Sequence, residues 1–135
     1  MPRPIALALA VFGLGVAFAP PATAQGGDTT AADSGLYSEQ QARRGQTQFT
    51  RACIRCHAPD AFTGTFIESW SGAPVSMLLD LVSSTMPEDR PGSLERRQYV
   101  DILAYILELN GLTPGQRELP VDQGQLEHIL IKRRP

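Results

Sequence analysis

Apolar residues recur at helical spacing in three stretches of the chain, at about residues 39–53, 74–84 and 94–110. In each stretch they recur every three or four positions, and polar residues fill the opposite side, which is typical of helices packed on a core. The positions that set the spacing are Ala42, Gly45, Phe49 and Ala52; then Val75, Leu78, Leu79, Leu81 and Val82; then Tyr99, Ile102, Leu103, Ile106 and Leu109. The pattern predicts three main helices.

Local signals indicate where these helices begin and end. Ser38 and Gln41 have the spacing of a capping box at the start of the first helix. Pro74 suits the first turn of the second, and Ser93 is the expected cap of the third. Gly111 is expected to end the third helix.

The segments between the helices are rich in proline and glycine. Residues 57–73 and 85–93 are predicted to be irregular, the first with buried aromatic residues. Since no stretch alternates like a pair of strands, the expected fold class is all-α, with three or more helices and long loops. Gly45 is unusual, because glycine inside a helix costs about 1 kcal/mol relative to alanine. Either a second helix approaches closely there or the misfit is simply tolerated.

The amino terminus has the pattern of a secretory signal peptide. Arg3 is the only charged side chain before Asp28, Ile5 to Ala19 is apolar, and the small residues up to Ala24 suit a cleavage site. An uncleaved anchor is the alternative, but the apolar run is short for a membrane span. We therefore expect an exported, periplasmic protein with no stable membrane insertion after cleavage.

The remaining chain divides into three parts by composition. After the signal peptide (1–24), residues 25–36 are predicted to form a flexible leader, 37–114 a single domain and 115–135 a carboxy-terminal extension. The end of that extension, 129–135, is expected to be a solvated tail, with His128 exposed. The net charge of −2 does not favour nucleic acid as a partner.

Both cysteines and one of the two histidines lie in the pentapeptide Cys53-Ile54-Arg55-Cys56-His57. A disulfide between Cys53 and Cys56 would close a very small ring and stabilise little. A thioredoxin-type dithiol belongs with strands that are not predicted, and a structural zinc site needs four ligands. Covalent haem fits best: in C-x-x-C-H both thiols bond to one haem c, and the histidine reaches the iron.

The chain resembles the class I c-type cytochromes with one haem, from about Ser38 to Gly111. Beyond the C-x-x-C-H motif, the resemblance rests on Gly45 and Phe49 in the first helix and on DILAYIL, residues 101–107, in the last. It implies a cytochrome c-like fold wrapped around the haem. It also implies that the first and last helices cross at Gly45, with Phe49 facing Tyr105 and Ile102.

The second axial ligand of the iron is expected to be Met86. It lies in the proline-bracketed string MPEDRPGSL before the last helix, which resembles the methionine-proline loop of that family. Met77, in the second helix, is expected to fill a gap in the core; it and an open iron site are the alternatives, and His128 is a remote third. Three aromatic residues could line the haem pocket or simply belong to the core: Phe66, Trp70 and Tyr99. In many relatives a proline carbonyl orients the ligand histidine; Pro59 and Pro74 are both present here, but neither has a spacing that matches, and the assignment stays open.

These features predict an electron-transfer protein, not an enzyme. The combination of MPEDRPGSL, DILAYIL and NGL-x-PG looks most like small cytochromes that accompany periplasmic quinoprotein dehydrogenases, which use pyrroloquinoline quinone. The resemblance implies such a dehydrogenase as electron donor and an oxidase or another cytochrome as acceptor. With Lys132 as the only lysine, arginines such as Arg51, Arg55 and Arg90 could serve docking instead. The alternative is a haem enzyme or gas-binding sensor with an open or displaceable sixth ligand.

Overall fold

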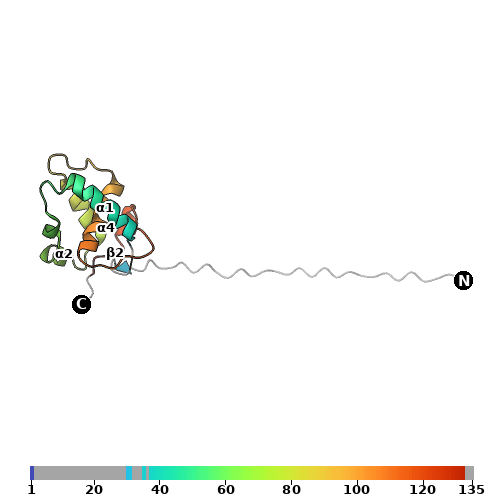
Figure 1. Ribbon diagram of the computed structural model, residues 1–135. Coiled ribbons are helices and arrows are strands. Elements are labelled where there is room, and N and C mark those ends of the chain that lie inside the picture. The colour runs from blue at the N-terminus through green and yellow to red at the C-terminus, as the bar shows by residue number, and fades with distance from the viewer. Residues whose placement is uncertain (2–29, 32–34, 36, 133–135) are drawn as a thin grey trace.

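The computed structural model describes residues 1, 30–31, 35 and 37–132 (Figure 1). This part of the chain is mostly helical, which is compatible with the predicted all-α class. Its elements are β1 (Thr30–Ala31), α1 (Glu39–Ala52), the 3-10 helix η2 (Pro59–Phe62), α2 (Thr65–Ser69), α3 (Val75–Thr85), α4 (Arg96–Leu109), α5 (Gln123–Leu126) and β2 (Ile129–Leu130). Except for Met1, the predicted signal peptide lies outside the described residues. No helix among those residues is both long and apolar enough to cross a membrane.

Helices α1 and α4 cross at the centre of the molecule (Figure 1). A Cβ atom on Gly45 would lie 1.8 Å from the backbone oxygen of Asp101 and 3.0 Å from Cβ of Tyr105. Next to this contact, the rings of Phe49 and Tyr105 pack edge to face, with centroids 5.5 Å apart. Close approach of a second helix, rather than a tolerated misfit, therefore explains the glycine.

The predicted helix ends are partly right. Ser38 caps α1, and its side chain accepts a hydrogen bond from the backbone N–H of Gln41. Helix α3 begins after Pro74, one residue later than predicted. The prediction of Ser93 as the cap of α4 is wrong: Glu95 is the cap, in a reciprocal capping box with Gln98.

The segment 57–73 is more regular than predicted. It contains η2 and α2, and the prediction of an irregular segment is wrong for these nine positions. Both helices are too short to show a full apolar period, and Pro59 stands in the first turn of η2, where the absence of a proline N–H costs nothing. Ile67 of α2 is buried, and Phe62 and Phe66 pack against the core.

Residues 115–132, from the predicted extension, complete the hydrophobic core. The buried side chains from this segment are Leu119, Leu126, Ile129 and Ile131. The prediction of a solvated tail is wrong for residues 129–131, whereas His128 is exposed as expected. Strand β2 pairs in parallel with β1, so two residues of the predicted leader, Thr30–Ala31, have a partner strand. These two-residue strands are too short to leave an alternating pattern in the sequence.

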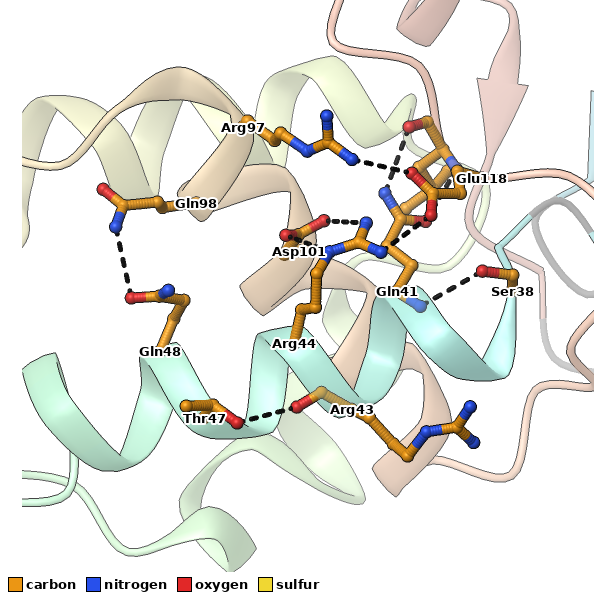
Figure 2. A network of polar contacts seen from close by, with 11 residues as sticks. Ser38, Gln41, Arg43, Arg44, Thr47, Gln48, Arg97, Gln98, Asp101 and Glu118 are labelled. Carbon is orange, nitrogen blue, oxygen red and sulfur yellow. Dashed lines mark hydrogen bonds and ion pairs between the residues drawn. The ribbon is translucent and has the colours of Figure 1, made fainter.

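A polar network fastens this last segment to both crossing helices (Figure 2). The guanidinium group of Arg44, on α1, donates two hydrogen bonds to Asp101 of α4, at 2.9 and 3.0 Å, and one to Glu118, at 2.8 Å. Asp101 and Glu118 raise the pKa of Arg44, chiefly through these hydrogen bonds. Beside it, the amide of Gln41 exchanges hydrogen bonds with both backbone groups of Leu119. The segment is thus an integral part of the fold.

Candidate functional site

The C-x-x-C-H motif forms a tight turn at the end of α1. Cys53 caps the helix, and its N–H donates to the carbonyl of Phe49 at 2.8 Å. The carbonyl of Cys53 then accepts from the N–H of Cys56 at 3.0 Å and from that of His57 at 2.9 Å. These bonds hold both sulfur atoms and the imidazole within one turn of chain.

This turn borders a cavity of about 440 Å³, within the range of small-molecule and cofactor sites. Its walls come from α1, the η2–α2 segment, the end of α3, the loop after α3, and α4. The lining residues are Phe49, Ala52, Cys53, Arg55, Cys56, His57, Phe62, Phe66, Leu81, Val82, Thr85, Met86, Pro87, Glu88, Asp89, Ile102 and Ile106. All four predicted ligand residues, Cys53, Cys56, His57 and Met86, therefore border the same space.

The cavity wall is largely apolar, and Phe62 stands at the centre of its aromatic part. The Phe62 ring packs edge to face against Phe49, Phe66 and His57, with centroids 5.5, 5.1 and 5.4 Å apart. Phe66 lines the cavity, as predicted, whereas Trp70 and Tyr99 do not border it. The sequence predicted buried aromatic residues in segment 57–73, but it did not predict that Phe62 would contact His57, because that contact depends on η2.

The two thiols are free, with Cys53 half-buried and Cys56 exposed at the cavity. Burial raises the pKa of the Cys53 thiol. Among the residues that the structure describes, no three His, Cys, Asp or Glu side chains gather as a metal-binding group.

Met86 and Met77 occupy contrasting places. Met86 follows the last turn of α3, where its N–H donates to the carbonyl of Val82 at 2.9 Å, and its side chain borders the cavity. Met77 is 55% exposed and borders no part of the cavity, so the prediction that it fills a gap in the core is wrong. His128 is likewise exposed and away from the cavity lining.

Charged residues stand at the rim of the cavity. Arg55, from the C-x-x-C-H turn, forms an exposed ion pair with Asp89 of the methionine loop, residues 86–94, at 3.5 Å. Of the three arginines considered for docking, Arg55 borders the cavity, and Arg51 and Arg90 are exposed without lining it. Neither Pro59 nor Pro74 lines the cavity, whereas Pro87, directly after Met86, does.

The residues present fit a haem c in their chemistry. Two free thiols, an imidazole and a thioether are the donor set that such a group needs, and the aromatic and aliphatic walls suit a large planar ring. In comparisons with protein-family models, curated proteins and solved structures, no match to this chain is found. The residues that line the cavity are therefore the basis for a function.

Proposed function

We propose that the protein is an electron carrier that holds one haem c. Cys53 and Cys56 would bind it covalently, and His57 and Met86 would be the axial ligands of its iron. One observation carries the proposal: Cys53, Cys56 and His57 of the C-x-x-C-H turn line the same apolar cavity as Met86, which comes from a separate loop. A methionine that merely packed in the core would have no reason to share that cavity with both thiols and the imidazole.

When bound, the haem would supply a reversible one-electron change between ferric and ferrous iron. The chain's own residues would supply the rest. The sulfur atoms of Cys53 and Cys56 would fix the group in place, and the apolar wall around Phe62 would keep water from the ring. A thioether opposite a histidine raises the reduction potential. With His57 and Met86 both bound to the iron, no position would be open to a substrate, so the protein would carry electrons and would not act as an enzyme.

The resemblance to class I c-type cytochromes supports the same proposal and extends it to a cytochrome c-like fold. That resemblance implies a close crossing of the first and last helices at Gly45, and α1 and α4 make such a contact. It also implies a methionine loop directly before the last helix, and Met86 precedes α4 at the cavity.

We also propose the periplasm as the location and a quinoprotein dehydrogenase as electron donor, with an oxidase or another cytochrome as acceptor. The support for the partners is the likeness of MPEDRPGSL, DILAYIL and NGL-x-PG to the small cytochromes of those systems. Rapid-mixing reduction of the ferric protein by purified quinoprotein dehydrogenases tests the donor. Reduction no faster with any of them than with an unrelated dehydrogenase would contradict it.

The ligand set is tested on protein produced in a host able to attach haem. We expect a low-spin ferric spectrum with the weak far-red band of methionine sulfur on ferric haem. Met86→Ala should abolish the band and lower the reduction potential, because the thioether is lost. Met77→Ala is the matched control, since that side chain is exposed away from the cavity, and it should change neither.

Two results would overturn the electron-carrier assignment. One is a high-spin ferric wild type that binds carbon monoxide readily after reduction, which would favour an enzyme or gas sensor with an open sixth position. The other is a purified protein that takes up no haem at all. If Met77→Ala rather than Met86→Ala removed the band, the axial assignment would be wrong.

A further inference from the structure

A single hydroxyl group joins the two ends of the methionine loop. This loop, residues 86–94, leads from the end of α3 toward α4. The hydroxyl of Tyr99 donates a hydrogen bond to the carbonyl of Met86 at 2.7 Å. The same oxygen accepts a hydrogen bond from the backbone N–H of Leu94 at 3.4 Å.

Tyr99 is itself held firmly. It lies in the first turns of α4, whose start is fixed by the capping box between Glu95 and Gln98. Its side chain is 3% exposed and belongs to the hydrophobic core. The position of the hydroxyl is therefore set by α4 and not by the loop that it contacts.

The carbonyl of Met86 has one other contact in the described chain, a longer bond of 3.4 Å from the N–H of Gly92. The Met86 N–H donates to Val82 of α3 at 2.9 Å. Met86 is thus tied to α3 through its N–H and to α4 through its carbonyl. If the loop moves away from the cavity, the 2.7 Å hydrogen bond between Tyr99 and the Met86 carbonyl must break.

We propose that Tyr99 is a positioning residue that keeps the Met86 sulfur on the iron, although its own side chain does not border the cavity. It acts through the backbone: release of Met86 moves the loop, breaks the Tyr99 bond and leaves the Met86 carbonyl poorly paired. This inference rests on the proposed function, because it assumes that Met86 is an axial ligand.

The variant that tests it is Tyr99→Phe, which keeps the ring in the core and removes only the hydroxyl. Tyr105→Phe is the matched control: Tyr105 is also a buried tyrosine of α4, and its hydroxyl bonds to no described residue. Imidazole is titrated into each ferric protein, and its displacement of the methionine is followed by loss of the far-red band.

We expect imidazole to bind Tyr99→Phe about tenfold more tightly than the wild type, because a short, part-buried hydrogen bond to a carbonyl no longer opposes opening. The reduction potential should fall as well, since the thioether is held less firmly on the iron. Tyr105→Phe should match the wild type in both. A role of Tyr99 in packing alone would lower global stability without changing imidazole affinity, and that result would overturn the proposal.

A second measurement needs no variant. Hydrogen exchange at the Leu94 amide of the wild type should accelerate when imidazole saturates the ferric protein, because opening breaks its bond to Tyr99. Amides in the middle of α4, such as that of Leu103, should be unaffected. Unchanged exchange at Leu94 would overturn the proposal even if Tyr99→Phe failed to fold. The failure of the proposed function would look different, since wild-type protein would then lack the methionine band before any imidazole was added.

Discussion

Gly45 of α1 lies against the backbone carbonyl of Asp101 in α4, leaving a gap into which not even a methyl group fits. Gly45→Ala would place Cβ at 1.8 Å from the Asp101 oxygen, so the two helices would have to move apart. We expect unfolding by urea to show a loss of about 3 kcal/mol, the upper range for forcing extra volume into a packed interior.

The matched control for that substitution is Gly124→Ala. Gly124 lies in α5, where an added Cβ would meet only a side-chain oxygen of Asp122 at 3.4 Å. This variant should be neutral or slightly stabilising, because alanine has the higher helix propensity. If both substitutions lowered the free energy of unfolding equally, the close approach of α1 and α4 at Gly45 would not be the cause of the loss.

Arg44 is expected to stabilise the protein far more than its neighbour Arg43. Asp101 is 4% exposed, so Arg44→Leu would leave its carboxylate buried without the guanidinium; we expect a loss of about 3 kcal/mol. Arg43 forms only an exposed pair with Glu39, and Arg43→Leu should cost less than about 0.5 kcal/mol. Adding Asp101→Asn to Arg44→Leu should restore part of the stability, which a double-mutant cycle measures. No recovery would contradict the buried-charge explanation.

Stability should decline in alkali because of Tyr37. Burial, and then the charges of Glu108 and Glu39, raise its pKa from 10.0 to about 12. Between these values the unfolded chain loses the proton while the folded protein keeps it, so stability falls as the pH rises from 10 to 12. Urea midpoints measured across this range should fall less steeply for Tyr37→Phe than for the wild type. Parallel curves would show that Tyr37 does not cause the decline.

Covalent attachment should require the two thiols. The double variant Cys53→Ala/Cys56→Ala should carry no haem after denaturing electrophoresis, because no sulfur is left to form a bond. The wild type and Met77→Ala should both retain it under the same conditions. Haem that stayed attached to the double variant would mean that another residue makes the bond.

The sequence predicted best where a residue type is costly or scarce. Glycine inside a helix has a cost that only a close contact justifies, so Gly45 pointed to the crossing that α1 and α4 make. Met86 directly precedes Pro87 in a loop with two prolines, whereas Met77 is on a helix, and the structure places Met86 at the cavity. A serine directly before a helical apolar pattern is typical of a helix cap, and Ser38 does cap α1.

The remaining features depend on contacts between distant segments. Three basic residues at the end of the chain suggested a solvated tail, yet Ile129 and Ile131 are buried. Their partners are known only once the chain is folded. The hydroxyl of Tyr99 bonds to the carbonyl of Met86 because of how the loop folds back on α4, and no local sequence pattern predicts this contact. Phe62 faces His57 because of a 3-10 helix of four residues, which is too short for periodicity to reveal.

The burial of Leu119, Leu126 and Ile131 has a consequence for the order in which the core can form. These residues follow α4 in the chain, so α1 and α4 are both made before the segment that completes their common core. Until residues 118 and 119 are available, Gln41 lacks its two hydrogen bonds to Leu119, and Arg44 lacks its bond to Glu118. The Cys53–His57 turn precedes these partners in the chain, so a protein made or exported amino terminus first exposes the turn before the surrounding structure is complete, which would give the proposed attachment of haem time to reach both thiols.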